Sequence, residues 1–197
     1  MALALEARAM KDDMMLGDTP KAKKRRRKLA DVKSGGRLWK HATLADIDGL
    51  VPTDTLQDYF CFSMVRNPWD RLVSYYHWLR VQSFDHSAVT LAQRLTFQDF
   101  VCDSQTQRSL LASPARHYVT DATGRALPTT FVRLEHLQSD LAPVEQHLGF
   151  SLTLGKVNPS ERRPDWRSYY DDCSAQAVAD SCQEDISRFG YVFDPST

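Results

Sequence analysis

Residues 60–80 read FCFSMVRNPWDRLVSYYHWLR, and this stretch decides the fold. The continuous apolar run 59–65 is typical of a strand that is buried on both faces of a parallel sheet. Asn67 is then a favourable helix N-cap, and Pro68 is a favourable first helical residue. The sequence therefore predicts a strand, a tight turn and a helix. The helix should bury four apolar residues at helical spacing, Leu72, Val73, Tyr76 and Leu79.

The turn between this strand and helix has the features of an anion site. A helix N-terminus offers unpaired N–H groups and the positive end of the helix dipole. Arg66 adds a planar fork of donors that suits a phosphate, and Ser74 adds a hydroxyl if its face turns toward the same pocket. The alternative is an ordinary strand, turn and helix in which Arg66 forms an ion pair with Asp70.

Residues 65–76, VRNPWDRLVSYY, resemble the 3′-phosphate-binding motif of sulfotransferases that use PAPS (3′-phosphoadenosine 5′-phosphosulfate). The likeness is to the carbohydrate sulfotransferase branch, with its VRNP-x-DRLVS-x-Y pattern. It implies that Arg66 and Ser74 hold the 3′-phosphate. It also implies an α/β fold, a P-loop-NTPase-like open parallel sheet flanked by helices, with the cleft at the carboxyl ends of the strands. The resemblance extends over about residues 36–193.

The start of the chain departs from the family pattern. Family members open with an apolar strand and a K-x-G-G-T-S loop that wraps the 5′-phosphosulfate, whereas residues 1–15 here have high helix propensity. The resemblance thus implies an N-terminally truncated member that begins inside the next helix. The glycine pair in Lys33–Gly36 follows no strand, so we expect a flexible loop there, with a phosphate role as the alternative. No G-x-x-x-x-G-K-[ST] motif occurs, which disfavours a P-loop NTPase.

His41 is the candidate catalytic residue. In the resemblance, a histidine at this point lies in the acceptor cleft before a short helix, here expected at residues 44–50 with Thr43 and Asp46 as its cap. Sulfuryl transfer requires a base for the acceptor hydroxyl, and a histidine that titrates near neutral pH suits that task. The alternative is a histidine that caps or packs.

A second strand is predicted at residues 128–134, followed by a helix that stops at Gly149. Residues 157–163, VNPSERR, resemble the family's late loop, which can fold over the nucleotide. Arg162 and Arg163 are therefore candidates for binding the phosphates or an acidic acceptor, and exposed arginines at a loop–helix junction are the alternative. The aromatic run at residues 165–170 is expected to pack rather than to stack on adenine.

The chain has 197 residues with 25 basic and 25 acidic side chains, but seven of the eight residues 21–28, KAKKRRRK, are cations. The simplest interpretation of this run is a solvated, mobile surface segment. The alternatives are a patch for an anionic acceptor and a nucleic-acid-binding tail. No aromatic residue is interleaved with the charges, so no nucleic-acid partner is expected. We expect one domain overall, with an N-terminal helix and basic mobile segment at 1–35 and a sulfotransferase-like domain at 36–197.

The four cysteines form no CxxC pair and no metal-ligand spacing with the six histidines, so no metal is expected. Reduced thiols, the absence of an apolar span and the absence of a signal peptide favour a cytoplasmic protein, unless an N-terminal anchor has been lost. Two functions remain open. The first is an enzyme that transfers a sulfuryl group from PAPS to a hydroxyl of a glycan, which could be anionic. The second is a truncated, inactive family member that serves as a nucleotide-binding or scaffold domain.

Overall fold

The computed structural model describes residues 1–155 and 162–194. The chain forms two compact units, and each is assembled from segments that are far apart in the sequence. Unit 1 comprises Met1–Met64, Ala115–Val132 and His136–Val157, and unit 2 comprises Val65–Pro114, Arg133–Glu135 and Asn158–Thr197. The division at residue 35 that composition suggests stays a prediction.

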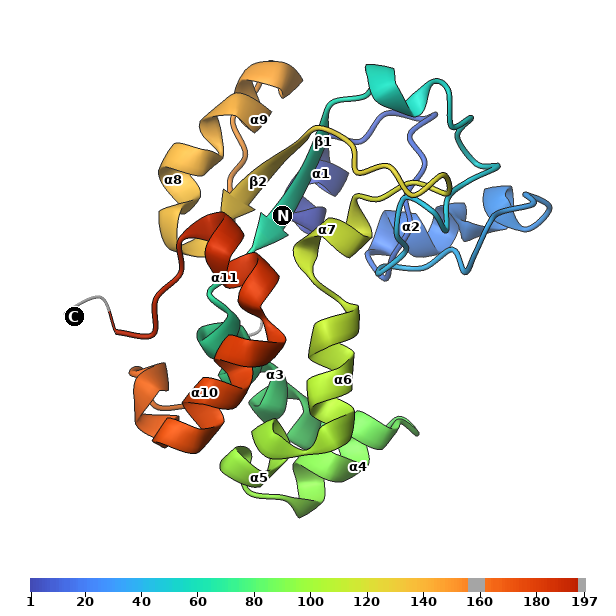
Figure 1. Cartoon of the computed structure of the whole chain (residues 1–197). Coiled ribbons are helices and arrows are strands. Elements are labelled where there is room, and N and C mark those ends of the chain that lie inside the picture. Colours follow the sequence, from blue (N-terminus) through green and yellow to red (C-terminus); the bar gives the residue numbers. More distant parts are fainter. Residues whose placement is uncertain (156–161, 195–197) are drawn as a thin grey trace. The chain divides into compact units, whose positions relative to one another are not determined.

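The chain is an α/β protein with a small sheet (Figure 1). In the described part of the chain the sheet has two strands, β1 (Cys61–Val65) and β2 (Thr129–Arg133), and their arrows run in the same direction. Both strands were predicted, and both are confirmed. The other elements of unit 1 are α1 (Ala2–Arg8), α2 (Pro20–Arg25), η1 (Arg26–Leu29), η2 (Leu56–Asp58), α7 (Ala115–Tyr118), α8 (Leu137–Asp140) and α9 (Ala142–Leu148), while η3 (Leu134–His136) crosses the boundary between the units.

Unit 2 is built around α3 (Pro68–Arg80), the helix predicted after β1. The Asn67 side chain accepts hydrogen bonds from the backbone N–H groups of Trp69 and Asp70, at 3.1 and 3.4 Å, so it is the N-cap. The remaining elements of unit 2 are α4 (Ser87–Arg94), α5 (Phe97–Cys102), α6 (Ser104–Ala112), η4 (Trp166–Tyr169), α10 (Asp172–Ser181) and α11 (Gln183–Phe189).

The core of unit 2 forms on the buried face of α3. The four apolar residues predicted to face inward are all 5% exposed or less. They pack with Phe97, Phe100 and Val101 of α5 and with Val178 of α10. The aromatic run before α10 joins this core, because the Tyr170 hydroxyl donates to the Trp69 carbonyl at 2.9 Å and Trp166 stacks near the Trp69 ring. These aromatic residues therefore pack within the unit, as the sequence predicts.

Residues 44–50, expected to be a helix, form a series of turns. The predicted cap itself is present, because the Thr43 N–H donates to Asp46 and the Asp46 N–H donates to Thr43. The helix does not continue, because Gly49 takes a φ of +87° and the Asp46 and Asp48 carbonyls accept from Gly36 and Gly35. The Asp46 carbonyl is thereby removed from a helical ladder.

Two helical stretches of the chain are each broken once. The helix that ends at Gly149 is split at Leu141, just before Pro143, into α8 and α9. Proline has no N–H and its ring clashes with the preceding turn, so a break is the expected result. The last helix is split at Cys182 into α10 and α11, and its N-cap is Asp171, with Ser174 as the third residue of a capping box.

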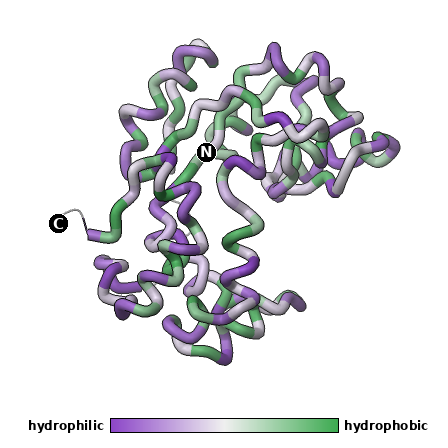
Figure 2. Tube along the Cα trace, in the orientation of Figure 1, coloured by the Kyte–Doolittle hydropathy of each residue, from purple (hydrophilic) through white to green (hydrophobic). Residues whose placement is uncertain are grey.

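The basic run forms helical turns, α2 and η1, rather than an irregular segment. The buried Glu6 carboxylate accepts from the backbone N–H groups of Lys21 and Ala22, at 2.8 and 3.4 Å, and so satisfies the start of α2. Figure 2 shows the run as one of the hydrophilic stretches of the chain. Among the described residues, no helix combines the length and hydropathy that crossing a bilayer would require.

Candidate functional site

One carboxylate in unit 2 holds two arginines from distant parts of the sequence. Asp70, in the first turn of α3, accepts from the Arg66 Nε at 2.7 Å and lies 2.6 Å from its Nη2. The other Asp70 oxygen lies 2.7 Å from the Arg162 Nη1. All three side chains are largely buried, with exposed fractions of 24% for Arg66 and 16% for Asp70 and Arg162. We call Arg66, Asp70 and Arg162 the arginine cluster.

The arginine cluster contains buried polar atoms without hydrogen bonds. Five such side-chain atoms occur among the described residues, and three of them lie in or beside the cluster: Asp70 Oδ1, Arg162 Nη1 and His77 Nε2. Arg162 and Asp70 are close enough to attract each other, but the orientation of the two atoms is not that of a hydrogen bond. Unpaired buried polar atoms are uncommon in proteins and often mark the place of an ion or ligand.

Ser74 shares a face of α3 with this cluster. Residues 66, 70, 74 and 77 are spaced by three or four positions, so they form one stripe along the helix and its leading turn. The Ser74 side chain is half-buried, and its hydroxyl has no hydrogen-bond partner among the described residues. The structure thus brings together Arg66 and Arg162, two of the four residues predicted to bind the nucleotide, and it places Ser74 one turn after Asp70 on α3.

Arg163, the fourth of these residues, is exposed next to the cluster. Its guanidinium lies over the Tyr169 ring, 4.2 Å from the centroid, and its backbone N–H donates to the Tyr169 hydroxyl at 2.8 Å. Arg167 is instead occupied by two carboxylates, Asp165 at 2.9 Å and Asp194 at 3.4 Å. Asn158 and Ser160, which belong to the same predicted loop, lie outside the described residues.

The turn that carries Arg66 is held from a second segment. Glu135, which follows β2, accepts from the Asn67 backbone N–H at 2.6 Å and from the Tyr191 hydroxyl at 3.3 Å. Burial, together with the nearby Glu135 carboxylate, raises the pKa of Tyr191, so this hydroxyl stays protonated and able to donate. A carboxylate is favourable near a helix N-terminus, and here it fixes the backbone from which Arg66 projects.

His41 lies in unit 1, in an exposed turn before the Thr43 cap. Its ring meets the Trp39 ring edge-on with centroids 4.7 Å apart. Partial burial lowers the pKa of His41 and the Lys40 charge lowers it further, while Asp18 acts in the opposite direction. A neutral imidazole at pH 7 is the form that a general base needs.

The backbone N–H groups of the glycine pair in Lys33–Gly36 form hydrogen bonds within the protein. The Gly35 N–H donates to the Asp48 carbonyl at 2.8 Å, and the Gly36 N–H donates to the Asp46 carbonyl at 3.0 Å. A Cβ on Gly35 would lie 2.5 Å from the Ala45 carbonyl oxygen. Both N–H groups therefore already have hydrogen-bond acceptors, and the backbone of residues 45–48 lies too close to leave room for a side chain. The glycines thus allow close packing against residues 45–48.

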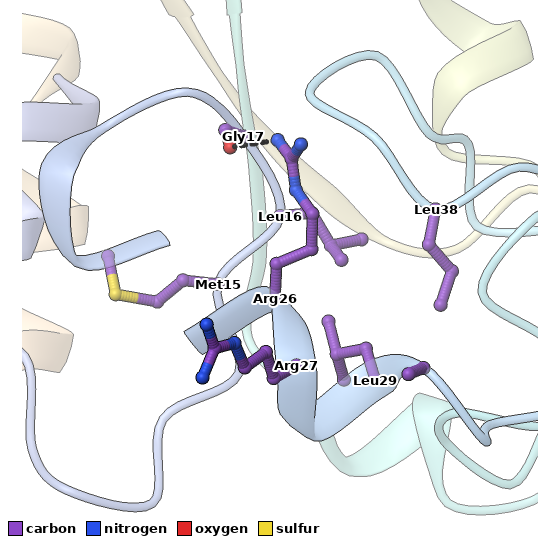
Figure 3. A pocket seen from close by; sticks show the side chains of 8 residues that line it. Met15, Leu16, Gly17, Arg26, Arg27, Leu29 and Leu38 are labelled. Carbon is purple, nitrogen blue, oxygen red and sulfur yellow. Dashed lines mark hydrogen bonds between the residues drawn. The ribbon is translucent and has the colours of Figure 1, made fainter. Parts of the chain in front are cut away.

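Unit 1 also contains a cavity beside the basic run (Figure 3). Its volume is about 340 Å³, and its walls are apolar except for two arginines, Arg26 and Arg27. The Arg26 guanidinium donates to the Gly17 carbonyl at 3.1 Å and pairs with Asp18 at 3.4 Å. The lining consists of Met15, Leu16, Gly17, Arg26, Arg27, Leu29, Ala30 and Leu38.

Nothing in the sequence alone identifies Asp70 as the bridge between two arginines, or the Nε2 atom of His77 as buried without a hydrogen bond. The available signal was the spacing of residues 66, 70, 74 and 77 on one helical face. The pairing of Asp70 with Arg162 crosses 92 positions and carries no local signal. Within the part of the chain that the structure describes, no group of three His, Cys, Asp or Glu side chains could hold a metal.

Comparison with known proteins gives the family. The model of the sulfotransferase family matches residues 14–192, which is most of the chain. No curated protein and no solved structure matches the sequence. The matched range includes the strand, turn and helix that carry Arg66 as well as the segment that carries Arg162. The chain therefore belongs to the sulfotransferase family.

Proposed function

We propose that the chain binds PAPS and transfers its sulfuryl group to a hydroxyl of a carbohydrate. In this proposal Arg66, Ser74, Arg162 and Arg163 hold the nucleotide, with the 3′-phosphate at Arg66 and Ser74. The observation that carries the proposal is the arginine cluster itself, in which two largely buried guanidiniums from distant segments meet at the first turn of α3. A phosphate supplies oxygens for the N–H groups of Arg66 and Arg162 that Asp70 leaves unused, so the residues present fit the group.

The arginine cluster suits an anion for a second reason. Asp70 already orients both guanidiniums, so little side-chain freedom remains to be lost when a ligand binds. Asp70 neutralises one of the two positive charges, and the cluster keeps a net positive charge before Arg163 is counted.

His41 is proposed as the base that takes the proton of the acceptor hydroxyl. PAPS, when bound, supplies the sulfuryl group, whose bond to the 5′-phosphate breaks as the bond to the acceptor oxygen forms. The hydroxyl must lose its proton in that step, and a neutral imidazole can accept it. The P-loop-like arrangement of the sheet belongs to this proposal too, because that arrangement would put the cleft at the carboxyl ends of β1 and β2.

The acceptor is proposed to be a glycan, and the basic run favours an anionic one. Lys23, Lys24 and Arg27 are exposed and have no ion pair among the described residues. A cluster of cations of this kind raises the local concentration of an acidic substrate.

The direct test is calorimetric titration of the full chain with 3′-phosphoadenosine 5′-phosphate (PAP), the desulfated product. Arg66→Ala should weaken binding about 10- to 100-fold, because hydrogen bonds to a charged group are worth about 1.5–3 kcal/mol. Arg108→Ala, which removes an exposed arginine of α6, is the matched control and should bind like the wild type. Failure of the wild-type chain to bind PAP would overturn the proposal.

A second assay separates the enzyme from a nucleotide-binding or scaffold domain. The chain is incubated with radiolabelled PAPS and hydroxyl-bearing glycans, both neutral and acidic. Label transferred to a glycan supports the enzyme. Binding of PAP without transfer to any glycan supports the binding domain instead, and it would leave Arg66 with the same role.

A further inference from the structure

His77 is a half-buried residue that the proposed nucleotide site does not yet use. It lies three residues after Ser74, on the same stripe of α3. Its Nε2 atom is buried and has no hydrogen-bond partner among the described residues. Leaving such a group without a hydrogen bond lowers the stability of the folded protein by about 1–3 kcal/mol. A ligand that pairs with Nε2 would explain why a histidine stands at this position.

The surroundings of His77 are aromatic and positively charged. Its ring meets the rings of Tyr169 and Tyr76 edge-on, with centroids 5.1 and 5.5 Å apart. The charges that act on the imidazole are Arg80 on the same helix and Arg162 and Arg163 from the segment before η4. All three are cations, and Tyr76 of α3 and Tyr169 of η4 are the titratable groups packed against the ring.

This environment keeps His77 neutral in the free protein. Burial lowers the pKa of His77, and the charges of Arg80, Arg162 and Arg163 lower it further. A bound anion would reverse the effect of the charges, because it adds negative charge at the same arginines and offers an oxygen to the imidazole. Packing alone would not require a ring nitrogen here, because a phenyl ring would fill the same space without an unpaired atom.

Building on the proposed nucleotide site, we propose that His77 is a further contact of the 3′-phosphate and takes up a proton when the phosphate binds. Arg162 Nη1 makes an ion pair with Asp70 but no hydrogen bond, and His77 Nε2 has no partner among the described residues. Both nitrogens can donate to the oxygens of a bound phosphate. Arg66 and Ser74 lie on the same stripe. Binding of the phosphate should then be accompanied by proton uptake. The uptake should be seen at pH values that lie between the pKa of His77 in the free protein and its higher pKa in the complex.

Two variants separate the contact from packing. His77→Phe keeps the ring against Tyr169 and removes both nitrogens, whereas His77→Gln keeps a neutral donor. His77→Phe should fold with equal or higher thermal stability, because it removes an unpaired buried atom. It should bind PAP about tenfold more weakly than the wild type at pH 7, the change that corresponds to a pKa shift of one unit. His86→Gln, at the exposed start of α4, is the control and should bind PAP normally.

The decisive measurement is the proton uptake on PAP binding, from titrations at pH 7 in buffers of different ionisation enthalpy. The phosphate itself titrates near pH 6 and so contributes to the number of protons exchanged on binding. The wild type is therefore compared with His77→Phe, in which the contribution of the phosphate is the same. The wild type should take up more protons than His77→Phe. In parallel, the ring signal of His77 in NMR spectra, assigned by its loss in His77→Phe, should shift its titration to higher pH when PAP is added.

The outcomes distinguish this inference from the proposed function. Normal PAP binding by the wild type, with equal affinity and equal proton uptake in His77→Phe, overturns the role of His77 and leaves the nucleotide site intact. An NMR titration of His77 that PAP does not move overturns it as well, even if a variant is unstable. Absence of PAP binding by the wild type overturns both. Adenosine 5′-phosphate, which lacks the 3′-phosphate, should bind the wild type and His77→Phe equally.

Discussion

At the scale of single residues, Asp70 decides how the arginine cluster is arranged. One carboxylate pairs with two guanidiniums, one oxygen to each. The sequence suggests two interpretations of Arg66, an ion pair with Asp70 or a phosphate ligand, and in the structure the ion pair is present. The two roles are compatible, because an arginine has five N–H donors and Asp70 uses only part of them.

Replacing Asp70 with Asn should destabilise the free protein and increase the effect of the ligand. Two largely buried arginines would lose their counter-charge, for an expected loss of about 2 kcal/mol in the free energy of unfolding. PAP should then raise the melting temperature of Asp70→Asn more than that of the wild type, since phosphate replaces the missing charge. Thermal unfolding with and without PAP measures both effects, with the exposed Asp54→Asn as control. An equal or smaller ligand shift in Asp70→Asn would contradict this expectation.

The proposed role of His41 as a general base predicts a specific pH dependence of the sulfuryl transfer rate. A general base must be neutral, so the rate should fall as the pH drops through the pKa of His41, which burial and Lys40 hold below the ordinary value of about 6.5. The rate should therefore be near its maximum at pH 7. Lys40→Gln should move the acidic limb of the profile to higher pH, because it removes a cation and releases Asp18 from the ion pair at 3.2 Å.

His41→Ala should reduce kcat by a factor on the order of 10²–10⁴, abolish the acidic limb and leave PAP affinity unchanged. The readouts are the pH–rate profile and the PAP titration. A profile that His41→Ala and Lys40→Gln both leave in place would exclude the residue as the base.

At the scale of elements, local sequence signals located the start of α3 and the two strands, because caps, prolines and apolar runs act over a few residues. They failed at residues 44–50. The Thr43 and Asp46 cap is present, yet the Gly36 N–H pairs with the Asp46 carbonyl that a helix would use. A long-range contact of this kind outweighs a local preference.

The packing role of Gly35 can be tested by adding a methyl group. Gly35→Ala would place a Cβ 2.5 Å from a backbone oxygen, so the free energy of unfolding should fall by about 1–3 kcal/mol. Gly155→Ala is the matched control, since a Cβ there meets nothing within 4 Å. Denaturant unfolding measures both variants. A phosphate-binding role for Gly35 predicts the reverse pattern, with lost PAP affinity and unchanged stability.

At the scale of the whole molecule, the even balance of charge conceals a concentration of cations in α2 and η1. Some side chains of the run form hydrogen bonds to backbone carbonyls of the same protein. Lys21 donates to the Glu6 carbonyl at 2.7 Å, and Arg25 donates to the Asp13 carbonyl at 2.9 Å. The exposed remainder, Lys23, Lys24 and Arg27, is the part that can attract an anionic partner.

Replacing Lys23, Lys24 and Arg27 together with Gln should raise the KM for an acidic glycan about tenfold at low salt and reduce its dependence on salt. The Kd for PAP should stay unchanged. The same three replacements at Lys33, Arg94 and Arg108, which are also exposed, control for net charge. Salt-dependent retention on DNA that only the first triple variant loses would favour a nucleic-acid partner instead.

The sequence by itself determined the strand, the Asn67 cap, the helix with its buried face, and the candidate residues Arg66 and Ser74, because each depends on neighbours within a few positions. Only the tertiary structure decided that Asp70 joins Arg66 to Arg162, that the Nε2 atom of His77 is buried without a hydrogen bond, and that Gly35 and Gly36 pair with a turn. These contacts depend on packing between segments that lie far apart in the chain, and such packing leaves no local pattern from which it could be predicted.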